Sequence, residues 1–222
     1  MKTLHSTLLG TSLFAVLSVT THAATFDNAI ENALKLGKAG KYGQIKLDLR
    51  YRYENVHVDT SVKNDASANT LRLRLGYLTP EIYKFQSYIE YEANLAMQED
   101  FNSSRNLNTG YETVVDPEAQ ELNQAWLSYT GLPDTLIKGG RQRIVLDNSR
   151  FIGNVGWRQM EQTYDAVLLT NNSIQNLTFN AAFIGAVQTI KSQNKSLDMP
   201  LLNASYKFGK FSTLTGYAYW LA

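Results

Sequence analysis

The feature that most constrains this chain is an alternation of apolar and polar residues in segments of about ten residues. In residues 43–56, odd positions from 45 to 53 carry Ile, Leu or Tyr, and even positions from 46 to 54 carry charged residues. The same alternation recurs in 70–77 and 84–95. This pattern predicts strands with one apolar and one polar face. A length of about ten residues fits a tilted strand that crosses a bilayer, whereas soluble strands are typically about five or six residues long.

Connections between these segments alternate between long and short. Residues 57–68, 97–119 and 142–162 are long and polar, whereas 78–82 and 131–134 are tight turns that contain Pro80 and Pro133. Later connections are short at 171–175, longer at 188–198 and two residues long at 209–210. Long connections on one side and short turns on the other are typical of outer-membrane barrels. The further strands are expected at 122–130, 135–141, 163–170, 177–187, 199–208 and 211–221.

The predicted fold is therefore an all-β, antiparallel transmembrane β-barrel of roughly nine strands. Bacterial single-chain barrels have an even number of strands. A free strand edge in a bilayer would also leave backbone groups without hydrogen bonds. We therefore expect an incomplete half of a barrel, closed by a missing C-terminal half or by a second copy. A small barrel with one strand miscounted remains an alternative.

The composition agrees with a barrel and excludes several other classes. The mean hydropathy is −0.27 despite 13 Tyr and 9 Phe, and no internal apolar run reaches the roughly 18 residues of a transmembrane helix. The formal net charge of +1 gives no support for nucleic acid as a partner, and the absence of Cys excludes disulfides.

The N-terminal region predicts export. Residues 1–23 have the pattern of a signal peptide, with Lys2, an apolar stretch at 8–19 and small residues before position 24. Residues 24–42 are expected to form a periplasmic arm or short helix, with a disordered leader as the alternative. Residues 43–222 are expected to belong to the barrel.

The segment 139–165 begins as the end of one strand and finishes as the start of another, and the part between them lacks a clean period and predicts a loop. The segment contains four arginines, the aromatic residues Phe151 and Trp157, and glycines at 153 and 156 that allow tight turns. A solvent-exposed loop does not need so many large cationic and aromatic groups. We therefore expect the loop to fold into a water-filled lumen, with its aromatic residues packed on the wall and its arginines facing a solute.

Three stretches resemble outer-membrane porins of the alginate-export family. They are GRQRIVLDNSRFIGNVGWRQMEQTYDA (140–166), LDLRYRYE (47–54) and LRLRLGY (71–77), within a resemblance that runs from about residue 43 to the end. The resemblance implies a channel in the bacterial outer membrane, in contact with lipid, with about twice as many strands in the whole barrel. It also implies passive diffusion of anionic solutes, such as acidic sugars or alginate-like polyuronates.

Charged residues on the polar strand faces supply the candidate lumen site. With the first long loop centred near Val62, Arg52 should lie opposite Arg72 and Arg50 opposite Arg74, with Glu90 and Glu92 beside Arg72. These charges predict either a salt-bridge ladder that holds the wall together or a positive track that attracts anions. The candidate lumen residues are Lys46, Arg50, Arg52, Arg72, Arg74, Arg141, Arg143, Arg150 and Arg158, with Lys84 as a possible extension. The candidate loop-pinning carboxylates are Asp147, Glu161 and Asp165.

Enzymatic signatures are scarce, so we expect a protein that is not an enzyme and has no cofactor or metal. His57 is the only histidine after the signal peptide, and a hydrolase would require Ser61 or Ser67 beside it. Trp126 and Trp157 are expected to pack against the wall rather than stack on sugars. The alternative function is that of a secreted soluble β-sandwich that binds carbohydrate.

Overall fold

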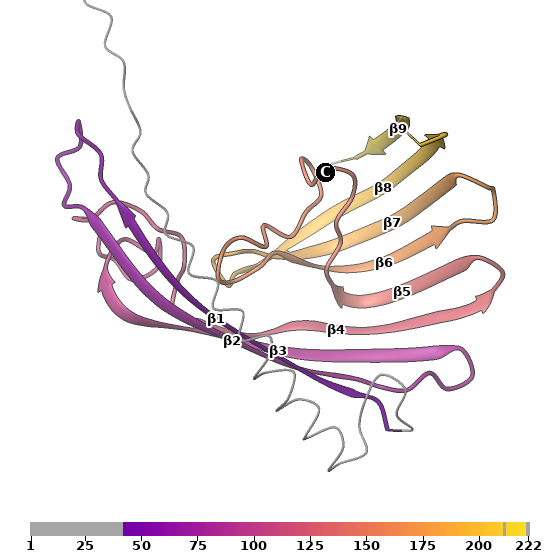
Figure 1. Cartoon of the computed structure of the whole chain (residues 1–222), viewed down its shortest axis with the longest axis horizontal. Helices are drawn as coiled ribbons and strands as arrows, with labels where there is room; N and C mark the ends of the chain where they lie inside the picture. The colour runs from indigo at the N-terminus through magenta and orange to yellow at the C-terminus, as the bar shows by residue number, and fades with distance from the viewer. Residues whose placement is uncertain (1–41, 211, 221–222) are drawn as a thin grey trace, which may run out of the picture.

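The computed structural model describes residues 42–210 and 212–220, in which nine strands form one antiparallel sheet (Figure 1). Each strand pairs with the next along the chain. The strands are β1 (Gln44–Val56), β2 (Ala66–Leu78), β3 (Phe85–Asp100), β4 (Ala119–Leu132), β5 (Thr135–Gln142), β6 (Thr163–Asn171), β7 (Leu177–Gln188), β8 (Asn194–Phe208) and β9 (Ser212–Tyr219). The all-β antiparallel prediction is confirmed. A soluble β-sandwich is not what the described residues form, because they contain a single sheet.

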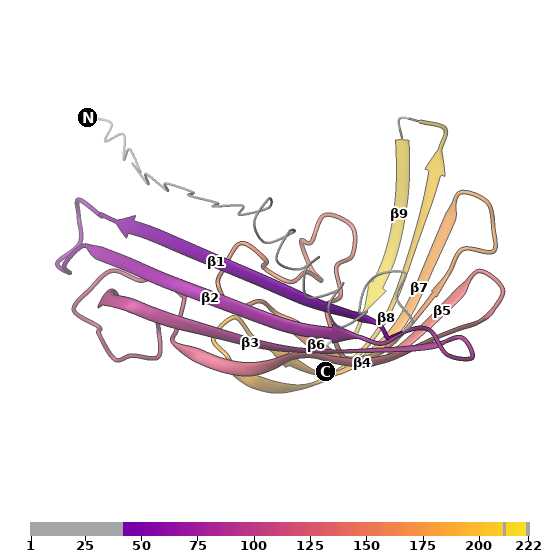
Figure 2. The ribbon, with the colours of Figure 1, turned by 60° about the horizontal axis from the view of Figure 1, so that its bottom comes forward.

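The sheet curves into a trough (Figure 2), and it is not closed. Within the described residues, β1 pairs only with β2, and β9 pairs only with β8. No helix there is long and apolar enough to cross a membrane. The predicted signal peptide at 1–23 lies outside the described residues, as does the predicted arm at 24–42 except for Tyr42.

Several strands are longer than their apolar alternation predicts. β2 begins at Ala66 rather than residue 70, β3 continues to Asp100, and β8 begins at Asn194 rather than residue 199. The connection between β7 and β8 is therefore residues 189–193, shorter than the predicted 188–198. Polar residues extend these strands because the ladder is made by backbone groups, which need no apolar side chains.

The register of β1 and β2 differs from the prediction by two residues. Arg50 lies opposite Arg72, Arg52 opposite Thr70, and Asp48 opposite Arg74. The hairpin is centred on position 61 rather than 62, and in an antiparallel pair a shift of one residue in the centre moves every partner by two. In the β2–β3 pair, Glu92 lies opposite Arg74 and Asn94 lies opposite Arg72. Glu92 nevertheless lies beside Arg72 as predicted, with its Oε1 3.9 Å from Arg72 Nε.

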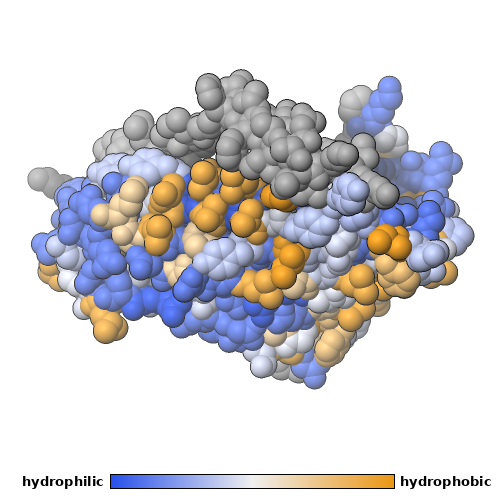
Figure 3. Space-filling model, turned by 90° about the horizontal axis from the view of Figure 1, so that it is seen from below, coloured by the Kyte–Doolittle hydropathy of each residue, from blue (hydrophilic) through white to orange (hydrophobic). Residues whose placement is uncertain are grey.

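The outer face of the sheet carries exposed apolar side chains in the middle of its strands. Leu49, Ile89 and Val167 are 59%, 54% and 57% exposed, respectively. Figure 3 shows apolar residues gathered on the face seen from below. Exposed apolar surface on this scale marks a face that is covered by another apolar phase or by a partner.

The connection between β5 and β6, residues 143–162, folds back over the concave face, and we call it the inward loop (Figure 1). Three apolar side chains of its first half pack on β6, β7 and β8. The buried side chains of this cluster are Ile144, Leu146, Ile152, Tyr164, Ala166, Ile184, Met199 and Leu201. Burying one such large apolar side chain contributes about 1.5–3 kcal/mol, so this half of the loop is held chiefly by the hydrophobic effect.

A second apolar cluster joins the start of β2 to the connection between β3 and β4. It consists of Ala66 and Ala68 from β2, and Phe101 and Val114 from the connection, all at most 2% exposed. Hydrogen bonds between backbone groups of the two long connections, such as Asn64 N to Gly110 O, add to this contact. The cluster fixes the connection whose Asp116 reaches the inward loop.

Candidate functional site

The second half of the inward loop is polar and is held on β1 and β2 by Gln159. The side chain of Gln159 is fully buried. Its Nε2 donates to Thr70 Oγ1 over 2.8 Å, and its Oε1 accepts from Arg50 Nε over 2.9 Å. Its backbone N–H donates to Asp116 Oδ1 over 2.9 Å. One neutral side chain therefore connects the loop to two strands and to a second loop.

Arg50 and Arg72 lie opposite each other, which is an unfavourable arrangement for two like charges. Each of the two guanidinium groups has its own hydrogen-bond and ion-pair partners. The guanidinium of Arg50 donates to the carbonyl oxygens of Gly156, over 2.9 Å, and Arg158. Arg72 forms an ion pair with Asp48 and donates to the carbonyl oxygen of Gln159 over 3.3 Å. The inward loop therefore supplies neutral acceptors where carboxylates are lacking.

Glu161 is the central carboxylate of the site and is fully buried. Arg143 Nε donates to its Oε2 over 2.7 Å, and Arg74 Nη2 lies 3.6 Å from its Oε1. Asn123 and Asn154 donate to it over 2.7 and 2.8 Å. Burial alone would raise the pKa of Glu161, but the hydrogen bond from Arg143 and the charge of Arg74 outweigh burial and lower the pKa to about 2. Glu161 is therefore ionised at neutral pH.

A further group of charges surrounds Trp157. Arg158 Nη1 lies 3.3 Å from Glu54 and 3.6 Å from Asp116, and Arg52 Nε lies 3.5 Å from Asp116. The guanidinium carbons of Arg52 and Arg158 lie 5.3 and 4.1 Å from the centre of the Trp157 ring, within the range of cation–π contacts. Trp157 is 54% exposed, so the expectation that it packs buried against the wall is wrong.

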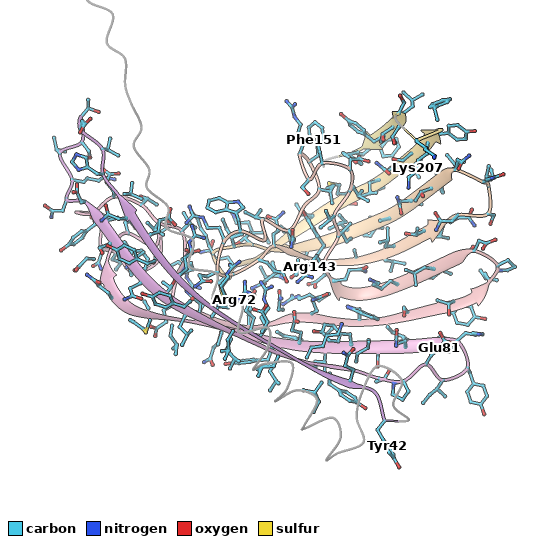
Figure 4. The ribbon with its side chains drawn as sticks, viewed as in Figure 1. Tyr42, Arg72, Glu81, Arg143, Phe151 and Lys207 are labelled. Atoms are coloured by element: carbon cyan, nitrogen blue, oxygen red, sulfur yellow. The ribbon has the colours of Figure 1, made fainter. Side chains whose placement is uncertain are left out.

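The charges of this cluster balance. Six arginines and six carboxylates gather where the inward loop lies on β1–β4. Figure 4 labels two of these arginines, Arg72 and Arg143. The arginines are Arg50, Arg52, Arg72, Arg74, Arg143 and Arg158, and the carboxylates are Asp48, Glu54, Glu90, Glu92, Asp116 and Glu161. Their formal charges sum to zero. This arrangement favours the salt-bridge ladder over a surplus positive track at this level of the wall.

The family model described as "Alginate export" matches residues 41–213 of the chain. The chain belongs to the alginate export family. The match includes all of β1–β8 and the inward loop. A comparison with curated proteins found no match.

Solved structures show that this member of the alginate export family shares its fold with porins. OccAB3 from Acinetobacter baumannii aligns with a TM-score of 0.61 and 14% identity over 80% of this chain and 49% of that one. OccK2 (OpdF) from Pseudomonas aeruginosa, solved in complex with glucuronate, aligns with a TM-score of 0.56 and 16% identity over 80% of this chain and 46% of that one. A BenF-like porin from Pseudomonas fluorescens Pf-5 aligns with a TM-score of 0.56 and 17% identity over 79% of this chain and 49% of that one. The chain thus spans about half the length of these proteins.

Three residues that the sequence predicts for the lumen site lie away from the charged cluster. Arg141 on β5 pairs with Asp165 on β6, with Nε 2.7 Å from Oδ1. Asp165 therefore joins two strands and does not pin the inward loop as predicted. Lys84 lies in the short turn between β2 and β3, where its Nζ is 3.4 Å from Glu81 Oε1. It does not extend a track along the lumen.

Two other predicted residues of this alginate export family chain, Asp147 and Arg150, lie in the first half of the inward loop. Asp147 accepts from Asn203 Nδ2 on β8 over 2.8 Å. Phe151 lies beside β9, with its ring centre 5.4 Å from that of Tyr217 (Figure 4). The exposed Arg150 lies over Phe151, 5.7 Å from the ring centre, and no carboxylate of the described residues is within 4.0 Å of it. Arg150 therefore keeps an unneutralised charge.

His57 has acidic partners rather than a nucleophile. Its Nδ1 lies 2.7 Å from Asp65 Oδ1 and its Nε2 2.9 Å from Asp59 Oδ1, and these hydrogen bonds raise the pKa of His57. Ser67 Oγ donates instead to Tyr53 Oη, and Ser61 Oγ accepts from the backbone of Lys63. The alternative in which His57 activates a serine in this alginate export family member is therefore contradicted. Among the described residues, no cluster could hold a metal ion.

Proposed function

We propose that this chain forms part of the wall of an outer-membrane channel through which acidic solutes diffuse without chemistry or energy input. The observation that carries the proposal is the inward loop, held on the concave face by an apolar cluster at one end and by buried charges at the other. A loop fixed in this way narrows a lumen without closing it. Membership of the alginate export family and the exposed apolar outer face support the same function.

The proposal places the protein in lipid and leaves its sheet to be completed. A wall with free edges needs further strands, which a C-terminal continuation or a second copy would supply. Residues 1–23 would direct export as a signal peptide. The solutes that we propose are small or polymeric acidic sugars, such as alginate-like polyuronates. The fold shared with OccK2, whose structure holds glucuronate, is compatible with this class.

Anion preference is proposed to arise outside the balanced cluster. Arg150 and Lys46 have no carboxylate of the described residues within 4.0 Å. Unneutralised cations on a low-dielectric wall raise the local concentration of anions. Arg72, by contrast, is 2% exposed beneath the loop and has no access to a solute. The arginines of the cluster therefore hold the loop, and the cations outside it attract the solute.

Selectivity under a KCl gradient tests this division. In a planar bilayer, the reversal potential of the protein is expected to favour chloride. The double variant Lys46→Gln/Arg150→Gln should lower the chloride-to-potassium permeability ratio by a factor of about two or more. Lys84→Gln, which removes a cation from a short turn, is the matched control and should leave the ratio unchanged. A ratio that favours potassium in the parent protein, or that does not respond to the double variant, would contradict the proposal.

A further inference from the structure

β4 extends past its neighbour β5 at the end of the sheet that carries the long connections. β4 pairs with β5 only from Ala125 onward, so residues 119–124 of β4 have no ladder partner on that side. β5 ends at Gln142 and β6 begins at Thr163, because the chain leaves the wall between them to form the inward loop. The wall past these two strand ends therefore lacks a backbone ladder on one side of β4, and side chains make the contacts there.

Four side chains join β4 and the β3–β4 connection to the hairpin of β7 and β8. Glu121, on the start of β4, accepts with Oε2 from Gln188 Nε2 over 2.6 Å and from Ser192 Oγ over 2.5 Å. Arg105, in the β3–β4 connection, donates through Nη1 to the carbonyl oxygens of Lys191 and Ser192 over 3.1 and 3.3 Å. We call Arg105, Glu121, Gln188 and Ser192 the strap.

The turn that carries Arg105 is anchored to the body of the protein. The backbone N–H of Arg105 donates to Ser103 Oγ over 3.2 Å, and Ser103 is 2% exposed. Asn106 donates through Nδ2 to the carbonyl oxygen of Phe101 over 2.8 Å, and Phe101 belongs to the second apolar cluster. The strap therefore connects a fixed turn to the tip of a hairpin, so its release lets the hairpin move away from the turn.

The strap is closed by contacts weaker than those that hold the inward loop. Neither Arg105 nor Glu121 forms an ion pair among the described residues, and both bond to neutral partners instead. The second carboxylate oxygen of Glu121, Oε1, is buried without a hydrogen-bond partner in the described part of the chain. Such an acceptor is unfavourable, and water would hydrate it if the strap opened. Opening therefore regains part of what it loses.

We propose that the strap is a latch on the lumen at the end with the long connections. When closed, it holds the β3–β4 connection against the β7–β8 hairpin and completes the wall past β5 and β6. When Arg105 and Glu121 release the hairpin, the wall opens on that side and this end of the lumen widens. The inward loop stays in place, because Gln159 and Glu161 attach it through other partners. This inference rests on the proposed function for the existence of a lumen.

A distance measurement between two spin labels tests the strap without requiring conductance. The chain has no cysteine, so Leu107→Cys in the β3–β4 connection and Gln193→Cys in the hairpin supply two exposed labelling sites. Double electron–electron resonance on the protein in detergent should give one narrow distance distribution. Adding Arg105→Ala/Glu121→Ala should create a population at longer distance. The ratio of open to closed molecules should rise by about tenfold or more, as expected for losing one hydrogen bond to a charged group.

A charge-matched control distinguishes the strap from a general change in charge. Glu112→Ala/Lys195→Ala also removes one carboxylate and one cation, but neither side chain takes part in the strap, and the distribution should stay unchanged. Arg105→Ala alone removes an exposed side chain and should shift the distribution in the same direction to a smaller extent. Circular dichroism of each variant checks that the sheet is retained.

The outcomes separate the strap from the channel. A distribution that the double variant leaves unchanged, or that the charge-matched control changes equally, overturns the strap even if the protein conducts ions. A longer distance in the double variant and not in the control upholds the strap even if bilayers show no current, and in that case the proposed channel is the claim that fails.

Discussion

Replacing Glu161 by glutamine is expected to release the polar half of the inward loop from β1–β4. The substitution removes the buried negative charge that faces Arg74 and Arg143, and a buried pair broken from one side costs about 3–5 kcal/mol. Hydrogen exchange of the backbone amide of Gln159, which donates to Asp116 Oδ1, should report the release. Its protection factor should fall by a hundredfold or more, since about 1.4 kcal/mol corresponds to a factor of ten.

The control for this experiment is Asp165→Asn. Asp165 also pairs with an arginine, but its side chain is 37% exposed, and exposed pairs contribute about 0–1 kcal/mol. We expect little change in the protection of Gln159. Equal effects of the two substitutions would show that burial of Glu161 is not what fixes the loop.

The same carboxylate gives the direction of a pH dependence. The pKa of Glu161 is lowered to about 2 from the ordinary value of 4.5. A pKa that is lowered in the folded loop stabilises the loop at pH values above the ordinary pKa. This stabilisation is lost as the pH falls from about 4.5 toward 2. Protection of the Gln159 amide, corrected for intrinsic exchange, should therefore fall across this window in the parent protein. In Glu161→Gln this component of the change should be absent.

Placing an arginine on the outer face should impair assembly in membranes. Leu49 lies near the middle of β1 and is 59% exposed. A cation on the lipid face near the bilayer midplane costs about 2–4 kcal/mol. Leu49→Arg is therefore expected to lower the free energy of unfolding in lipid vesicles by that amount, measured by urea titration.

Two controls distinguish lipid contact from damage to the strand. Leu49→Met keeps an apolar side chain at the same depth, and Lys46→Arg places a guanidinium on the opposite face of the same strand. Both should remain within about 1 kcal/mol of the parent. If Leu49→Arg is equally stable in vesicles, then this face of β1 does not contact lipid.

Sequence patterns predicted the sheet well because the alternation of side chains is a local property. All nine strands and the short turns follow from it. The inward position of the β5–β6 connection was predicted instead from its arginines and aromatic residues. The register of β1 and β2 could not be fixed, since the 57–65 connection gives no signal of its centre. A difference of one residue in that centre moved the partners of Arg50 and Arg52 by two positions along β2. The start of β8 was also missed, because its polar residues form the strand ladder without any alternation of apolar and polar side chains.

The contacts of the inward loop depend on which distant residues the curved sheet brings together. Gln159 and Asp116 carry the loop's attachment, yet neither lies in an alternating segment, so no sequence pattern distinguished them. The arginines were predicted as lumen residues, but the carboxylates around them come from two strands and two connections. The equal number of arginines and carboxylates in the cluster could therefore be recognised only in the three-dimensional structure.

The most direct test of the central claim is the single-channel conductance of the protein in a planar bilayer, compared with that of a variant lacking the inward loop. In this variant, residues 145–160 are replaced by a Gly-Ser linker of about four residues. The account predicts discrete current steps for the parent protein and steps that are several-fold larger for the variant, because the loop narrows the lumen. Steps of equal size would show that residues 143–162 do not form the constriction, and a complete absence of steps from both proteins would contradict the channel itself.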